Sequence, residues 1–418
     1  MREESTPTVP SGTPTNPRFS FMANYTDPDP YRTFAQIRAE TPVFYYPEMD
    51  LWVVTRYDDL SALLRDHKRF SSVDAMIRTM RLPADVVAIL SDSQEGQAAS
   101  MISVDPPEHS RLRAFAQKAL TPRRVALLED SVRATVNRLV DGFIDQGQAE
   151  LIKQFAYQLP LRVICRLIGV PDADAGKVNV WCDDVMEMLF GYPPHERLLE
   201  CARSQVAYRR YLGALVDQRT ANPQDDFTSD LIHAVLAGEQ QMTRAEVISM
   251  LAGLVMAGYE TTVNALGNCI YNLLREPDRW QAILDDPSLI PNAVEENMRF
   301  DGTGVGIFRR AIEDVTLHGV TIPAGALVYV LFGSGNHDET QFPEPERFDL
   351  RRENARQHLG FGLGIHYCIG APLARLEMVV ALQVLRERLP GLRLAPEDPM
   401  AYRPSVARGP LYLRVVWG

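Results

Sequence analysis

The chain has 418 residues, 46% of them hydrophobic, and its formal net charge is −11. This length and apolar share are sufficient for a deep core, which excludes a disordered chain. The acidic balance and the lack of a long basic run disfavour nucleic acid and an anionic membrane surface as partners. The sequence therefore predicts a neutral or apolar target.

The sequence contains no segment that predicts a membrane or secreted location. No stretch reaches the roughly 18 uninterrupted apolar residues of a membrane span. Residues 1–20 also lack the apolar core of a signal peptide. We therefore expect a cytoplasmic protein.

The two ends of the chain carry the signals for tail and strands. Residues 1–20 are rich in Pro, Ser and Thr and predict a flexible tail. Alternating apolar and polar residues over 42–57 predict a β-hairpin, and the β-branched runs 326–332 and 410–417 predict strands near the other end. We expect these terminal strands to meet in one sheet.

Between these strands, apolar residues recur at helical spacing in several long segments. The segments cover roughly 123–145, 155–168, 176–190, 196–219, 244–275, 290–299 and 371–388. Because no internal repeat or low-complexity linker separates them, we expect one domain over 21–418. The predicted fold class is mainly α with a small β portion.

The longest helical segment, 244–275, is bounded by clear signals. Thr243 and Glu246 have the spacing of a capping box at its start, and Pro277 follows its end. In its middle, Glu260 and Thr261 bring polar groups into an otherwise apolar helix. They could face solvent or bond back to the helix, or they could have a function.

A glycine-rich loop surrounds one of the cysteines. The stretch FGLGIHYCIG (361–370) places Gly362, Gly364 and Gly370 around Cys368. Glycine allows φ > 0 or the close approach of another body, so the loop predicts a large, flat group whose ligand is the thiol. The chain's five cysteines are an odd number and form no CxxC pair, which argues against disulfides and structural zinc.

Five motifs occur in one order along nearly the whole chain. They are DPPEHSRLR (105–113), AGYETT (257–262), EENMR (295–299), PERF (345–348) and FGLGIHYCIG (361–370). Together they resemble the cytochrome P450 family in its soluble bacterial form. One ExxR alone would be a weak signal, whereas all five in register are specific. The resemblance implies the P450 fold, a triangular helical domain with a small β-rich region.

The resemblance makes Cys368 the thiolate ligand of the iron of a haem b. A thiolate donates electron density that favours O–O cleavage, and the following helix begins close enough to stabilise the negative sulfur. Phe361 would lie beside the sulfur, and Gly362 and Gly370 would let the macrocycle approach. The other four cysteines would be inert core residues.

The family's positions for the haem propionates match four basic residues, which are His109, Arg113, Arg309 and His366. His109 and Arg113 are spaced to share one helical face. Arg310 leaves a one-residue ambiguity, and its spacing to Asp314 favours Arg309. A partly buried pair of propionates needs such donors.

The resemblance also implies a buried ion-pair network made by Glu296, Arg299 and Arg347. Such a network is costly unless all of its donors are satisfied. We therefore interpret these three residues as structural rather than catalytic.

The long helix would pass over the distal face of the haem in this family. Ala257 and Gly258 would contact the haem there, and Glu260 and Thr261 would be the catalytic residues that deliver protons during oxygen activation. This acid and alcohol pair favours an O2-dependent monooxygenase over peroxide-driven relatives.

The monooxygenase reading requires a separate electron donor, because no G-x-G-x-x-G motif follows a strand. We expect a ferredoxin or flavodoxin with its NAD(P)H reductase, docking near Arg111, Lys118 and Arg375 on a monomer. Two alternatives remain open. The same residues could perform oxidative coupling or desaturation, or the protein could be a non-catalytic haem sensor or electron carrier.

Small residues mark the walls of the predicted substrate pocket. The substrate-binding candidates are Gly253, Met256, Ala257, Val305 and Gly306. The segment 188–196 breaks two helices as a mobile lid would, although the glycines after Arg299 could equally form an ordinary turn. Small walls and a lid predict a bulky, mainly apolar ligand such as a polyketide, macrolide or terpenoid.

Overall fold

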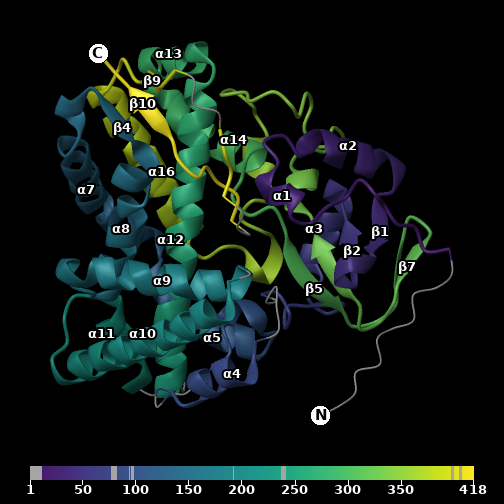
Figure 1. Ribbon diagram of the computed structural model, residues 1–418, viewed down its shortest axis with the longest axis horizontal. Coiled ribbons are helices and arrows are strands. Elements are labelled where there is room, and N and C mark those ends of the chain that lie inside the picture. The colour runs from purple at the N-terminus through teal and green to yellow at the C-terminus, as the bar shows by residue number, and fades with distance from the viewer. Residues whose placement is uncertain are drawn as a thin grey trace. The chain divides into compact units, whose positions relative to one another are not determined.

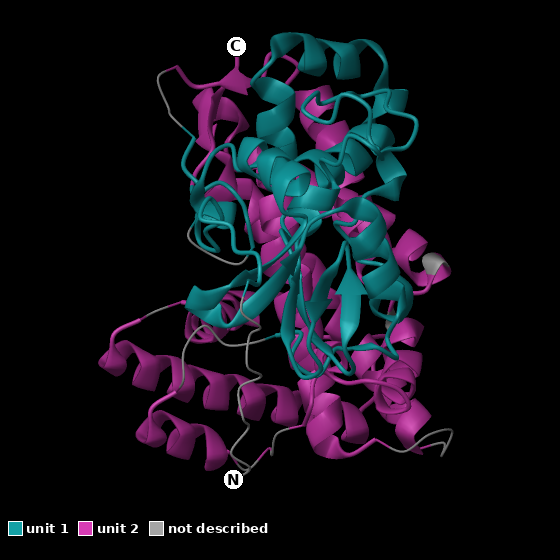
Figure 2. Cartoon of the chain, turned by 90° about the vertical axis from the view of Figure 1, so that its right-hand side faces the viewer, with its two compact units in different colours: residues 1–76, 268–368, 399–411 teal, residues 77–267, 369–398, 412–418 magenta. Residues whose placement is uncertain are grey.

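A computed structural model describes residues 12–76, 82–93, 95, 98–191, 193–236, 242–396, 400–403 and 407–418. Contacts divide the chain into two units, each assembled from separate stretches (Figure 2). Unit 1 contains residues 1–76, 268–368 and 399–411, and unit 2 contains 77–267, 369–398 and 412–418. This division could not be predicted from local composition, because no linker marks where the chain passes from one unit to the other.

Unit 1 is built on a five-stranded sheet in the order β1-β2-β8-β5-β3 (Figure 1). Its strands are β1 (Val43–Tyr46), β2 (Leu51–Val54), β3 (Phe70–Ser71), β5 (Ile307–Ala311) and β8 (Leu327–Val330). The predicted hairpin is confirmed, since β1 and β2 pair antiparallel with Val43 opposite Val54. β2 then pairs in parallel with β8, so the early hairpin and the strand predicted at 326–332 do share a sheet.

Helices and a small hairpin complete unit 1. They are α1 (Ala23–Thr26), α2 (Tyr31–Glu40), α3 (Tyr57–Arg65), α13 (Pro277–Asp285), α14 (Ile290–Phe300), α15 (Phe332–Gly335) and the two-stranded β6 (Val315–Leu317) and β7 (Val320–Ile322). α3 packs on the sheet through Leu60, Leu63 and Leu64, which lie in one buried cluster with Val54 and Val330. This i, i+3, i+4 spacing is the apolar stripe of a surface helix.

Unit 2 is mainly helical. It contains α4 (Ala84–Ser91), α5 (Glu108–Ala119), α6 (Pro122–Leu127), α7 (Glu129–Asp141), α8 (Gln158–Ile168), α9 (Ala175–Phe190), α10 (His195–Ala221), α11 (Phe227–Leu236) and α16 (Ala371–Arg388). α9 and α10 lie side by side (Figure 1). The break predicted within 188–196 is confirmed, because α9 ends at Phe190 and α10 begins at His195.

The longest helix, α12 (Arg244–Leu274), begins in unit 2 and ends in unit 1. The predicted capping box is present. The Thr243 N–H donates to Glu246 Oε2 at 2.7 Å, and the Glu246 N–H donates to Thr243 Oγ1 at 3.2 Å. These bonds satisfy backbone donors that the first helical turn leaves without partners, which is why the helix starts here.

The prediction that all terminal strands meet in one sheet is wrong for the last strand. β10 (Arg414–Val416) pairs instead with β4 (Gln148–Glu150) and β9 (Arg393–Leu394) in a separate sheet of unit 2. Trp417 explains this choice, because its indole N–H donates to Ile144 O at 3.0 Å and its ring packs on Phe143.

The flexible tail was also predicted too long. Residues 1–11 lie outside the described residues, but the chain is packed onto β1 from about Pro14. The Tyr45 N–H donates to Pro14 O at 2.9 Å, and Phe19 is buried with its ring 5.3 Å from that of Phe44. One buried aromatic residue therefore orders a segment whose composition predicted disorder.

Candidate active site

The cysteine loop, residues 361–370, contains the 3-10 turn Gly364–His366, and Cys368 is the last residue of the 268–368 stretch of unit 1. Cys368 is exposed, whereas the other four cysteines are buried. Burial raises the pKa of the thiols of Cys165 and Cys182 to about 12 and that of Cys201 to about 11, and it raises the pKa of Cys269 further. Only the thiolate is a metal ligand, so the structure disfavours these four cysteines as ligands.

The glycines of the loop have two different roles. Gly362 and Gly364 have φ of +67° and +71°, a region that L side chains rarely adopt. A Cβ on Gly364 would also lie 2.4 Å from Leu64 O of α3, so the loop rests directly on that helix. A Cβ on Gly362 would meet nothing closer than 3.8 Å, which leaves this side of the loop open. Gly370 is the N-cap of α16 and has ordinary αR geometry.

The loop is closed by a backbone hydrogen bond at the sulfur-bearing residue. The Cys368 N–H donates to Phe361 O at 2.8 Å, and the Gly362 N–H donates to Leu359 O at 2.7 Å. Phe361 and Cys368, which lie seven positions apart in the sequence, are therefore adjacent in the fold. The predicted association of Phe361 with the ligand cysteine fits this geometry.

The structure separates the two arginines of β5. The Arg310 guanidinium already has partners, because it pairs with Asp74 and donates to Gly325 O at 2.6 Å. Arg309 points the other way, is buried, and donates to the Phe308 carbonyl at 2.8 Å. The assignment of Arg309 rather than Arg310 as the propionate donor is consistent with this alternation.

The remaining candidate propionate donors lie on different elements. His366 belongs to the turn before Cys368 in unit 1 and is half-buried. In unit 2, His109 and Arg113 stand one turn apart on α5, with His109 buried and Arg113 half-buried. Their i, i+4 spacing places both on one face of that helix, as predicted.

The middle of α12 exposes a line of small residues. Ala257 and Thr261 are exposed and Gly253 and Met256 are half-buried, although most of this helix is buried. Positions 253, 257 and 261 follow i, i+4, i+8 spacing and share one face. The Thr261 hydroxyl donates to Ala257 O at 2.7 Å, so it bonds back to the helix and is also accessible.

Glu260 and Gly258 face other neighbours in unit 2. Glu260 is 8% exposed. Burial is the main cause of the raised pKa of the Cys182 thiol on α9, and the charge of Glu260 contributes to that shift. A Cβ on Gly258 would lie 3.5 Å from Ile164 of α8, an ordinary packing distance. α12 continues as an α-helix through this point.

The predicted ion-pair network is correct in two of its three members. Glu296 and Arg299 are fully buried and form a two-pronged pair at 2.8 Å. Arg347 was predicted as the third member, and this is wrong. Its side chain is 63% exposed and pairs with exposed Glu344, so it contributes only its carbonyl, which accepts from Arg299 at 3.2 Å.

Arg352 takes the place that Arg347 was expected to fill. Its side chain is 6% exposed and its Nε donates to both oxygens of Glu296 at 3.1 Å. Its remaining N–H groups donate to the carbonyls of Pro343, Glu344 and Arg347. The sequence held only a weak signal for it, since PERFDLRR carries three arginines within six positions.

Val305 and Gly306 pack within unit 1. Val305 is buried, and a Cβ on Gly333 would lie 3.2 Å from its side chain. A Cβ on Gly306 would lie 2.5 Å from the Tyr329 ring, so glycine is required here by packing alone. The contribution of these two residues to a substrate pocket stays a prediction.

Comparison with known proteins identifies the chain. The family model for cytochrome P450 matches residues 177–388. A mycinamicin IV hydroxylase/epoxidase from Micromonospora griseorubida is 41% identical over 373 residues, which cover 88% of this chain and 90% of that protein. The chain belongs to the cytochrome P450 family. Another P450, the monooxygenase PikC from Streptomyces venezuelae, is 37% identical over 397 residues, covering 93% of this chain and 91% of PikC.

Solved P450 structures have the same fold. Cytochrome P450 CREJ in complex with (4-ethylphenyl) dihydrogen phosphate matches with a TM-score of 0.89 at 35% identity, covering 94% of this chain and 98% of that one. The predicted fold class is confirmed, and the protein is a P450 monooxygenase with haem b as its cofactor. None of the helices in the described ranges is long and apolar enough to cross a membrane.

The residues of this P450 fit a haem. An exposed thiol in an open glycine loop suits an iron ligand, and buried or half-buried Arg and His side chains suit two propionates. When bound, the haem supplies oxygen activation. Cys368 would hold the iron, and Arg309 and His366 of the same unit would be propionate donors. The roles of His109 and Arg113, which belong to unit 2, stay predictions.

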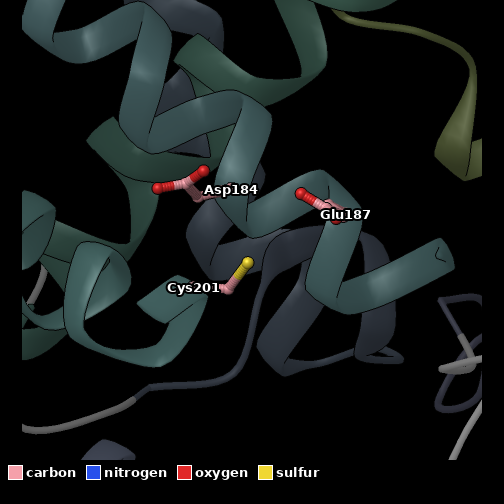
Figure 3. Close-up of side chains that lie close together, drawn as sticks. All are labelled: Asp184, Glu187 and Cys201. Carbon is pink, nitrogen blue, oxygen red and sulfur yellow. The ribbon is translucent and has the colours of Figure 1, made fainter. Parts of the chain in front are cut away.

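A second cluster in unit 2 has metal-binding residue types but is already neutralised. Asp184 and Glu187 of α9 lie close to Cys201 of α10 (Figure 3). Arg197 pairs with both carboxylates, and the Ser204 hydroxyl donates to Asp184. We interpret the cluster as an ion-pair network that joins α9 to α10.

Proposed function

We propose that this P450 inserts one oxygen atom from O2 into a bulky, mainly apolar small molecule. The observation that carries the proposal is the exposed face of α12, where Gly253, Ala257 and Thr261 leave room on an otherwise buried helix. Small, apolar walls accept large ligands by shape rather than by polar contacts. The similarity to a mycinamicin IV hydroxylase/epoxidase supports a natural product of that size.

We assign the proton-handling roles to two neighbouring residues of α12. Thr261 presents its hydroxyl on the exposed face while it bonds to Ala257 O, so it can hold and pass a proton there. Glu260 is the buried neighbour of Thr261 on the same helix, and its carboxyl can resupply that proton.

The electrons would come from a separate ferredoxin or flavodoxin and its reductase. Of the three cations considered for docking, Arg111 is already paired with Glu108 and with Glu246 of α12. Lys118 is exposed at the end of α5, and Arg375 is half-buried on α16. All three cations stay candidates for docking an acidic partner.

Substrate size can be tested by filling the α12 face. A Cβ on Gly253 would be 3.9 Å from Ser100 Oγ, so a side chain can start there without a clash. We expect Gly253→Leu to weaken the Soret shift caused by mycinamicin IV at least about tenfold in Kd, the effect of losing ~1.4 kcal/mol. Gly176→Leu, on the exposed first turn of α9 with nothing within 4 Å of its Cβ, is the matched control.

The same assay separates the alternatives. Strong binding of camphor with no response to mycinamicin IV or other bulky macrolides would refute the substrate class. Reduction by surrogate ferredoxin and reductase, followed by incorporation of label from ¹⁸O2 into product, tests oxygen insertion. Coupled or desaturated products that carry no ¹⁸O would indicate oxidative coupling or desaturation instead of oxygen insertion.

A further inference from the structure

A buried histidine lies at the entrance of the cysteine loop, in a place that no role assigned so far explains. His358 precedes the FGLGIHYCIG stretch, and its side chain is 1% exposed. Its Nε2 lies 3.2 Å from Oε2 of Glu295 on α14, whose side chain is 3% exposed. A buried pair of this kind persists only where its hydrogen bonds are satisfied.

Both ring nitrogens of His358 are engaged. The Gly360 N–H donates to Nδ1 at 3.0 Å, so Nδ1 accepts and the ring proton is on Nε2, which donates to Glu295. The ring also packs on Phe361, with centroids 5.4 Å apart. The His358 side chain thus connects α14 to Gly360 and Phe361, where the cysteine loop begins.

Leu359, which lies between His358 and Gly360, is also held by a hydrogen bond. The Leu359 N–H donates to Oδ1 of buried Asn336 at 2.6 Å, and the Asn336 carbonyl accepts from Arg299 at 3.0 Å. Gly360 must be glycine, because a Cβ there would lie 2.8 Å from Met298 O. The loop entrance is therefore clamped by contacts from α14 and from Asn336.

The two adjacent glutamates of α14, Glu295 and Glu296, bind different partners. Glu296 holds Arg299 and Arg352, which fix the segment around 343–352. Glu295 points to a different side of the helix and holds His358. The contacts of His358 and Leu359 extend to Cys368 through Phe361, whose carbonyl accepts a hydrogen bond from the Cys368 N–H at 2.8 Å.

We propose that His358, oriented by Glu295, is a positioning residue that sets the geometry of the Cys368 thiolate through Gly360 and Phe361. The proposal rests on Cys368 being the haem ligand. Outer groups that orient a metal ligand tune its binding and its redox behaviour as well as its stability. The pair should therefore affect the thiolate itself and not only the free energy of unfolding.

Two substitutions in the holoenzyme test the two hydrogen bonds of the His358 imidazole separately. His358→Asn keeps an acceptor near Nδ1 but cannot reach Glu295, and His358→Gln keeps a donor near Nε2 but loses the acceptor for Gly360. We expect amide hydrogen exchange over 359–368 to be on the order of tenfold faster in each, since one buried bond is lost. We also expect part of the ferrous CO complex to lose the thiolate band, and the midpoint potential to shift.

The partner glutamate and a neighbouring residue provide the comparison. Glu295→Ala should reproduce the histidine variants, whereas Glu295→Gln keeps an acceptor oxygen and should restore most of the thiolate band. Asn292→Ala is the matched control, because Asn292 of the same α14 donates to the carbonyls of Leu350 and Arg352 at 2.9 and 3.2 Å. It should lower stability while exchange over 359–368 and the CO spectrum stay unchanged.

Two results would overturn the proposal. One is a His358 variant with normal exchange over 359–368 and a normal CO spectrum and potential. The other is an Asn292→Ala variant that loses the thiolate band as much as the His358 variants do, which would reduce the effect to general destabilisation. Failure of the ligand assignment is distinguishable, because it would appear as a thiolate band that survives in Cys368→Ser.

Discussion

Arg352, and not Arg347, belongs to the buried network. Replacing each of them by methionine should therefore change the free energy of unfolding by very different amounts. Arg352 is 6% exposed, binds both oxygens of Glu296 and donates to three backbone carbonyls, so Arg352→Met removes all of these hydrogen bonds and one of the two arginines that pair with buried Glu296. Breaking a buried pair costs ~3–5 kcal/mol. Arg347 and Glu344 are 63% and 74% exposed, and such a surface pair is worth ~0–1 kcal/mol.

Urea unfolding followed by the Soret band measures this difference. With a slope of about 3 kcal/mol per molar urea, Arg352→Met should lower the midpoint by about 1–2 M and Arg347→Met by less than about 0.3 M. Both substitutions remove one guanidinium, so the net charge change is matched. A midpoint loss for Arg347→Met equal to or greater than that for Arg352→Met would refute the network described above.

Three further predictions concern the site and its surroundings. Cys368→Ser should abolish the thiolate CO spectrum, and the matched Cys201→Ser should leave it intact. Thr261→Ala should still consume NAD(P)H but divert electrons to hydrogen peroxide, while Glu260→Gln slows turnover on the order of a hundredfold; unchanged coupling in the alanine variant would exclude Thr261. Burial raises the pKa of Glu377 on α16 well above its ordinary value, and one of its oxygens has no hydrogen-bond partner among the described residues. Its contribution to stability is present below about pH 4.3 and is lost as the pH rises toward the folded pKa, so Glu377→Gln should raise the urea midpoint at about pH 7 and have little effect near pH 4.

Local sequence patterns predicted the longest helices and the framework of the cysteine loop, but the helical segments expected from the sequence left out α1 to α5, α11, α13 and α15. The segments at 176–190, 244–275 and 371–388 match α9, α12 and α16 within about one residue, because apolar spacing, caps and proline act over a few residues. The positive φ of Gly362 and Gly364 belongs to the same class, since only glycine adopts such a backbone at low cost.

Only the tertiary structure decided which of several equivalent residues is buried. PERFDLRR offers Arg347, Arg351 and Arg352, and nothing local distinguishes them. Arg352 is selected because the segment folds back onto α14 so that, of these three arginines, Arg352 is the one whose guanidinium meets Glu296. Likewise, β10 joins β4 rather than the hairpin's sheet because Trp417 packs on Phe143, and His358 meets Glu295 across 63 positions of sequence. Such long-range contacts depend on how whole elements pack, which no short pattern in the sequence encodes.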